Sequence, residues 1–294
     1  MFPFRRPRHT DTGPRAAACE FGQNARVLFF RMNTWTLIAV LVAMIGGSSA
    51  IGVFAGRRLR SRSDSLQGPL GVVQGTLLGL VGLLLAFGLT MAVGRYDERR
   101  ALVVQEADDI GTAYLRAQTL DEPARSTSLA LFKQYADAAV RLSHEPTGTS
   151  AFDAARAELA RIQQQLWTSA GQALRVDPTG NASRLYVEAL NPVFDVHTDR
   201  VSSLRNLVPT PVLLLEILGS AVALAVLALY LSMIGRGLTT TVVAAAIVLF
   251  ILFVSFDLDR PERGYIRVPS TPLEDTRELM DLPPAVAAPS RAQA

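Results

Sequence analysis

The sequence predicts an all-α membrane protein: four transmembrane helices, with a helical soluble domain inserted between the second and third spans. Three observations predict this fold class. Apolar residues make up 49% of the 294 residues and charged residues only 19%, a balance that a soluble domain rarely shows. The apolar excess lies in four long uncharged runs. The stretch between the second and third runs repeats its apolar residues at helical spacing, without strand-like alternation.

Each uncharged run approaches the ~20 residues that a helix needs to cross ~30 Å of hydrocarbon. We expect spans at Thr34–Phe54, about Val72–Val93, about Val212–Ile234 and about Leu238–Phe256. A basic linker, 57–70, is expected between the first two. Four spans place both termini on one side of a multi-pass protein. The arginines of the short loops are divided between the two sides, and we expect the soluble domain and both termini inside.

The predicted organisation has five parts: a disordered basic tail (1–31), the first two spans (32–94), a helical soluble domain (95–209), the last two spans (210–257) and a C-terminal segment (258–294) that is mobile near its end. The tail carries a net charge of +4 and leaves the remainder at −1, so nucleic acid is not an expected partner.

Met32 is an alternative site for the start of translation. Cys19 is the only cysteine, which excludes an intrachain disulfide. The heavy Arg and Ala usage points to a bacterial protein.

The second span is predicted to continue as one long helix that leaves the membrane near Arg95 and reaches Arg116. One face of this span carries small residues that let helices approach closely, and we expect them to set helix contacts. They are Gly75, Gly79, Gly82 and Ala86. A different face is apolar, with Leu80, Leu83, Leu84, Phe87 and Met91. Such a face ordinarily packs or meets lipid, but in a ring-shaped oligomer it could line a dry constriction.

The soluble domain is expected to hold further helices. One begins near Asp121, and a second is capped by Thr149 or Ser150 and carries an apolar stripe from Phe152 onward. A third covers about 181–206 and contains Pro192, which should kink it.

No catalytic constellation is present, and we expect the protein not to be an enzyme. Asp195, His197 and Asp199 are close in sequence, but residues two apart on a helix point ~200° apart, so these side chains do not converge. His197 is therefore interpreted as a surface histidine. Glu106, with the two aspartates that follow it, is interpreted as a solvated acidic face.

The segment after the last span is dense in acids and turn residues. Asp257, Asp259 and Glu262 could bind a hard cation through oxygen ligands, which makes them a candidate cation site. On spacing alone, the favoured alternative is an ordered loop that is salt-bridged by Arg260 and Arg263.

Several of these stretches carry a resemblance. Leu83-Leu-Leu-Ala-Phe87, followed by a junction of Arg95, Tyr96, Asp97, Arg99 and Arg100, is similar to the bestrophin family, in which an apolar helix exits into a Tyr-Asp signature. Glu106, the run Ile110-Gly-Thr-Ala-Tyr-Leu-Arg116 and Ser255-Phe-Asp257 more specifically resemble the bacterial bestrophin-like membrane proteins. This narrower resemblance covers nearly everything from Asn33 to about Leu279.

The resemblance implies a four-span subunit of a pentameric, anion-selective channel in the bacterial inner membrane. Its partners would be the lipid bilayer, copies of itself and inorganic anions such as chloride. Leu83 and Phe87 would lie on the pore neck, whereas Gly79 stands where bestrophins carry a bulky apolar residue.

The three acids of the candidate cation site fall near the bestrophin calcium clasp but lack its continuous acidic run. Calcium is thus the one cofactor that the resemblance implies, and the residues alone predict none.

The alternative function is a membrane-anchored helical-bundle sensor or scaffold without transport activity.

Overall fold

The computed structural model describes residues 33–60, 63–235, 237–260 and 264–285, and within these ranges the chain is helical, without strands. Four helices are long and apolar enough to span a membrane: α2 (Thr34–Leu59), the first part of α3 (Ser63–Ala117), α7 (Thr210–Met233) and α8 (Leu238–Leu258). They confirm the predicted fold class. The predicted tail lies outside the described residues.

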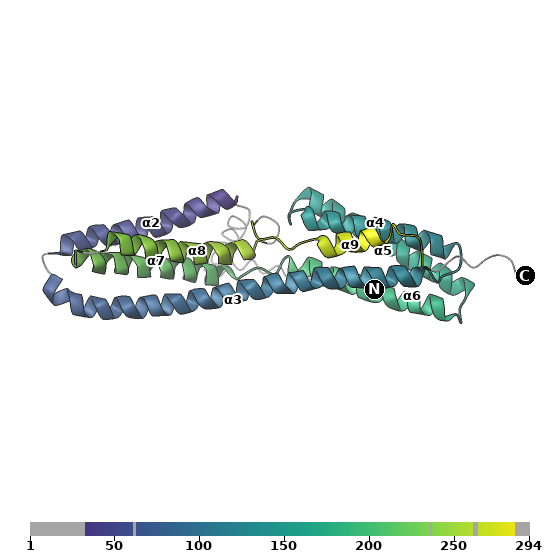
Figure 1. Ribbon diagram of the computed structural model, residues 1–294, viewed down its shortest axis with the longest axis horizontal. Helices are drawn as coiled ribbons and strands as arrows, with labels where there is room; N and C mark the ends of the chain where they lie inside the picture. The colour runs from purple at the N-terminus through teal and green to yellow at the C-terminus, as the bar shows by residue number, and fades with distance from the viewer. Residues whose placement is uncertain (1–32, 61–62, 236, 261–263, 286–294) are drawn as a thin grey trace, which may run out of the picture. The chain divides into compact units, whose positions relative to one another are not determined.

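The chain divides into two compact units, and α3 contributes to both (Figure 1). Of the described residues, the membrane unit comprises those from Asn33 to Met91 together with Val208–Phe256. The helical unit comprises Ala92–Leu207 together with the described residues from Asp257 to Ala285. It contains α4 (Ala124–His144), α5 (Ser150–Val176), α6 (Asn181–Ser203) and α9 (Thr271–Leu279).

Two glycines allow α2 to pack closely against α7 in the membrane unit. A Cβ atom on Gly52 would collide with the carbonyl oxygen of Ala225, and one on Gly56 would collide with that of Leu229. Both glycines continue the buried face of α2, which includes Leu37, Leu41 and Ile45. Since lipid is as apolar as these side chains, close van der Waals contact between helices is what holds such a bundle together.

Three of the small residues predicted on α3 do not have this role. A Cβ added at Gly75, Gly79 or Gly82 would meet no atom within 4 Å, so the prediction that they set helix contacts is wrong within one protomer. Instead α3 packs through Val81, which lies under Gly219 of α7, and through Leu85. These two positions, four residues apart, define the packed face of this span.

The core of the helical unit is built from apolar stripes on α3, α4, α5 and α6. At its centre Phe132 is fully buried, and its ring makes edge contacts with Tyr114 on one side and Tyr186 on the other. The predicted cap of α5 is confirmed, because the Thr149 hydroxyl accepts a hydrogen bond from the Phe152 amide at 3.2 Å. This unit therefore has a core of its own.

Two segments differ from the sequence prediction. The linker expected at 57–70 is largely helical: α2 continues to Leu59 and α3 begins at Ser63, with Pro69 inside it. Pro69 lies in the second turn, where it removes one main-chain hydrogen bond near a helix end whose groups are in any case partly unpaired.

The second difference is α9, which was not predicted, although Ser270 followed by Pro272 is a helix-start signal. Helix α9 is tied to α4 and α3. Arg277 donates to Asp137 at 2.7 Å, and the Tyr114 hydroxyl donates to the Met280 carbonyl at 3.1 Å.

Candidate functional site

An exposed apolar strip runs along α3 opposite its packed face. Leu83 is 54% exposed and Phe87 is 60% exposed, whereas Val81 and Leu85 are buried. Leu80 and Met91 extend the strip in both directions. Because Leu83 and Phe87 are four residues apart, their side chains lie above one another on the helix surface. Within one protomer this strip is available to lipid or to other copies of the chain.

The arginines of the predicted signature junction bind the chain segment that follows the last span. Arg99 is 2% exposed, and its guanidinium donates to three main-chain carbonyls: Ser203 at 3.4 Å, Asn206 at 3.1 Å and Leu258 at 3.2 Å. A planar guanidinium with five N–H groups suits such a multiple contact. Arg99 thereby fastens the end of α6 and the end of α8 to α3.

Asp259 completes this arrangement, since its carboxylate lies 3.4 Å from Arg95 and 3.8 Å from Arg99. The other junction residues do not converge with these two: Tyr96 is half-buried, while Asp97 and Arg100 are exposed. The structure therefore brings together two of the five predicted junction residues, and their partner is one of the predicted cation-site acids.

Asp257 binds its own loop. Its carboxylate is fully buried and accepts hydrogen bonds from the amides of Tyr265 at 3.0 Å and Ile266 at 2.8 Å. Gly264 is needed at this turn, because a Cβ there would lie 2.7 Å from the Asp257 carbonyl oxygen. Glu262 lies outside the described residues, and no group of three or more metal-binding side chains gathers among those described. The cation site with Glu262 stays a prediction.

The helical unit also contains a buried ionic cluster that the sequence interpretation missed. Glu106 of α3 is fully buried; its carboxylate contacts the Arg200 guanidinium and lies 2.9 Å from Nδ1 of His197. His197 is 6% exposed, so its interpretation as a surface histidine is wrong, as is that of Glu106 as part of a solvated face. His197 and Arg200 lie on the face of α6 that carries Val193, and this helical spacing is the signal that could have found them.

Burial and charge act in opposite directions on the Glu106 carboxyl. Burial alone would raise its pKa, but the charge of Arg200 and the hydrogen bond from His197 outweigh burial and hold the pKa below its ordinary value. The neighbouring Tyr135 has its edge toward the His197 ring, and burial, followed by the charge of Glu106, raises the pKa of Tyr135 well above its ordinary value. The cluster therefore contains an ionised pair, Glu106 and Arg200.

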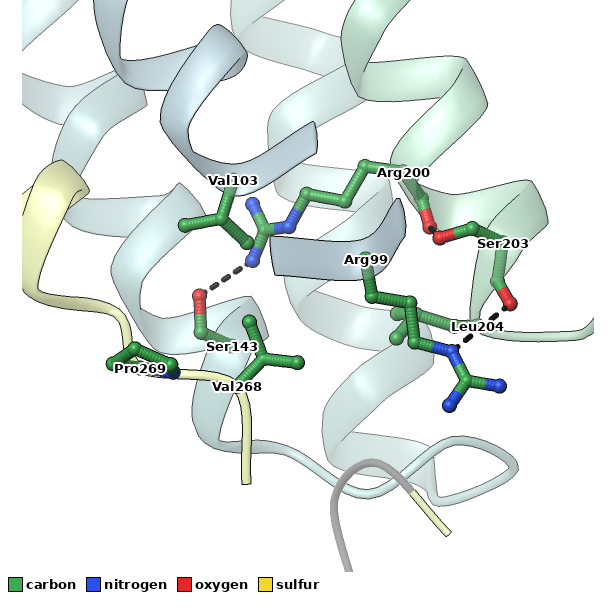
Figure 2. A pocket seen from close by; sticks show the side chains of 8 residues that line it. All are labelled: Arg99, Val103, Ser143, Arg200, Ser203, Leu204, Val268 and Pro269. Carbon is green, nitrogen blue, oxygen red and sulfur yellow. Dashed lines mark hydrogen bonds between the residues drawn. The ribbon is translucent and has the colours of Figure 1, made fainter. Parts of the chain in front are cut away.

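A small cavity of about 30 Å³ lies beside this cluster (Figure 2). Arg99 of α3 and Arg200 of α6 both line it, and Arg200 also donates to the Ser143 hydroxyl of α4 (Figure 2). The remaining lining residues are Val103, Ser203, Leu204, Val268 and Pro269. This volume accommodates one or two waters and no organic substrate. The arrangement is suited to holding α3, α4 and α6 together, and it offers no paired nucleophile and base.

Comparison with known proteins identifies the family and the fold. A family model described as a bestrophin-like domain matches residues 37–273. A crystal structure of a variant of a bacterial bestrophin homologue from Klebsiella pneumoniae is similar, with 13% identity and a TM-score of 0.62, over 80% of this chain and 97% of that chain. A crystal structure of a variant membrane protein has 14% identity and a TM-score of 0.57, over 82% and 97%. No curated relative matches the chain significantly.

Proposed function

The chain belongs to the bestrophin-like family, and from this premise we propose that it is one subunit of a homo-oligomeric channel for inorganic anions in the bacterial inner membrane. The observation that carries the proposal is the exposed strip on α3. Leu83 and Phe87 face away from the membrane unit while the opposite side of the same helix is packed. In a ring of subunits, such as the pentamer that the family resemblance implies, this strip would form an apolar neck.

The apolar neck explains how such a ring could control flow without charged groups. An ion must shed water to pass a narrow apolar ring, so small changes in the width of the ring alter conduction steeply. Gly79 lies one turn before Leu83 and has no side chain, so the proposed neck would be wider at the level of Gly79. We therefore propose that Phe87 and Leu83 alone form the constriction.

Liposome flux tests the proposal. The full-length protein reconstituted in liposomes should pass chloride, and Phe87→Ala should increase the flux severalfold, because a smaller side chain widens the apolar ring. The matched control is Phe250→Ala on α8, since Phe250 is also well exposed in the membrane unit, at 68% against 60% for Phe87, but lies off the proposed neck. A strictly monomeric particle by native mass spectrometry, or no ion flux from the wild-type protein, would contradict the proposal.

The second candidate is a membrane-anchored sensor or scaffold, and the observation in its favour is the self-contained core of the helical unit. In that case α3 would act only as an anchor, and Phe87→Ala and Phe250→Ala would be equally silent. The two candidates therefore differ in the same liposome experiment. An enzymatic function is not proposed, because the buried polar side chains Glu106, His197 and Arg200 pair with one another.

A further inference from the structure

The chain that leaves the last span is held against the end of that span. Asp257 lies in the final turn of α8, and its buried carboxylate accepts the amides of Tyr265 at 3.0 Å and Ile266 at 2.8 Å. The main chain of these two residues therefore lies within hydrogen-bond distance of a membrane-spanning helix at the point where the helix ends. Residues 264–267 thus form a loop at the boundary of the bilayer.

This loop exposes apolar side chains at that boundary. Tyr265 is 63% exposed and Ile266 is 37% exposed, although the amides of both are held by Asp257. A tyrosine has an apolar ring and a polar hydroxyl tip, and for this reason tyrosine and tryptophan are enriched where hydrocarbon meets water. The exposed pair therefore has the chemistry of a contact with the lipid interface.

The main chain of the loop is paired within the protein. The Gly264 amide donates to the Arg260 carbonyl at 3.0 Å, and the next two amides donate to the Asp257 carboxylate. The Gly264 carbonyl accepts from Nε of Arg267 at 3.2 Å. Water would serve these groups in an aqueous loop, whereas an unpaired main-chain group in a layer poor in water is costly. The internal pairing therefore allows the loop to enter such a layer.

A second exposed aromatic side chain belongs to the same side of the membrane. Four spans alternate in direction, so the start of α2 and the end of α8 lie on one side. Trp35, in the first turn of α2, is 68% exposed. Trp35 and Tyr265 thus each stand at the end of a span on that side, as the members of an interfacial aromatic belt do.

We propose that residues 264–267 form a bilayer-contact site, in which Asp257 holds the loop so that Tyr265 and Ile266 enter the headgroup boundary of the lipid. The internal pairing of three consecutive amides and the attachment to the end of a span favour lipid over a second copy of the chain as the partner. The proposal does not depend on ion conduction, and it applies equally to a channel subunit and to a membrane-anchored sensor.

The test is tryptophan fluorescence of the full-length protein in vesicles of phosphatidylcholine and phosphatidylglycerol. The background is Trp35→Phe with Trp167→Phe, which removes both native tryptophans. Bromine quenches tryptophan on contact. Tyr265→Trp should lose about half of its emission when the phosphatidylcholine carries bromine near the headgroup, and far less when the bromine is at the far end of the acyl chains.

The matched control is Leu279→Trp in the same background, because Leu279 is exposed to a similar degree, at 64%. The carbonyl of the next residue, Met280, accepts from the hydroxyl of Tyr114, which lies ~30 Å along α3 beyond Arg95, where the helix leaves the membrane. This tryptophan should be quenched by aqueous iodide and not by brominated lipid.

Each outcome decides the inference. Quenching of Tyr265→Trp by iodide instead of brominated lipid would place the loop in water and overturn it. Protection from both quenchers would mean that a second copy of the chain covers the loop, and would overturn it too. Ile266→Trp is a second variant that should show the same order of quenchers. Size-exclusion profiles that match the wild type show that each variant is folded, and a protein that conducts no ions would remove the proposed channel and leave this inference standing.

Discussion

Glu106 and Arg200 form a buried ion pair that joins α3 to α6, although 94 residues separate them in the chain. His197 holds the second carboxylate oxygen, and Arg200 reaches on to Ser143 of α4. Three helices of the helical unit are therefore fixed to one another by a single carboxylate. Buried ion pairs of this kind are expensive to break, because removing one partner leaves the other charge buried without compensation.

Glu106→Gln should destabilise the helical unit by about 3 kcal/mol at neutral pH, because Arg200 then lacks its counter-charge. The matched control is Glu158→Gln, which breaks the exposed pair with Arg141 and should cost less than about 1 kcal/mol. Thermal melting of the full-length protein in detergent measures both. Equal losses for the two variants would contradict the assigned role of the buried pair.

The same carboxyl group predicts how stability depends on acid. The pKa of Glu106 is held below its ordinary value of 4.5, so the unfolded chain binds its proton more readily than the folded protein does. The contribution of the pair is complete above about pH 4.5 and disappears as the pH falls through the lower, folded-state pKa. Melting temperatures measured from pH 7 downward should thus fall less steeply in Glu106→Gln than in the wild type.

Arg99→Lys should weaken the helical unit even though it keeps the charge. A lysine ammonium cannot reach the Ser203, Asn206 and Leu258 carbonyls together, so buried acceptors lose their donors, at a cost of about 1–3 kcal/mol. Arg100→Lys, on the exposed neighbouring residue, should be close to neutral. Chemical denaturation followed by circular dichroism compares the two, and a neutral Arg99→Lys would argue against the carbonyl clamp.

Gly52→Val should disrupt the membrane unit, because the new side chain collides with the main chain of α7. Overpacking of this kind typically costs about 1–3 kcal/mol and can cost more against a rigid backbone. Gly46→Val is the control on the same helix, since a Cβ there meets no atom within 4 Å. Fluorescence-detected size exclusion after heating should show early aggregation for Gly52→Val only.

Leu273→Ala should loosen α9. Leu273 is fully buried in the core of the helical unit, and truncating such a leucine costs about 2–5 kcal/mol. Leu279→Ala on the same short helix removes a side chain that is 64% exposed and should be nearly neutral. Hydrogen–deuterium exchange across 271–280 reports the difference, and equal exchange in both variants would contradict the docking of α9.

The four spans were predictable because the bilayer imposes length and apolarity on each run independently of the rest of the chain. The long α3 was predictable for a similar local reason, since the run from Leu77 to Arg116 contains no proline and, after Phe87, only Gly88, Gly94 and Gly111 as weak helix formers. The buried state of Glu106 was not predictable from its own helix, where its neighbours Asp108 and Asp109 suggest solvent. It depends on Arg200, and no local pattern links residues 94 positions apart.

The candidate site likewise combines features that could be predicted from the sequence with features that could not. The exposed strip with Leu83 and Phe87 followed from helical spacing, and the structure shows the opposite face packed. An ordered loop was the favoured interpretation of Asp257 and Asp259, but their partners were not foreseen. Spacing alone cannot tell which amides or arginines a carboxylate will meet. The contact between Glu216 of α7 and Gly88 of α3, where an added Cβ would lie 2.6 Å from the carboxyl carbon, could not be predicted from local sequence either, because it joins two different spans.

The position of α9 in the chain has a consequence for biosynthesis. The helical unit draws Asp257, Asp259 and Leu273 from the last part of the polypeptide, although most of its core precedes the third span. During translation the third and fourth spans are therefore made before Arg99 can meet the Leu258 carbonyl or Tyr114 can meet Met280. Completion of the domain thus requires synthesis through Met280, and a product truncated before α9 would lack the Leu273 side chain that is buried in the core.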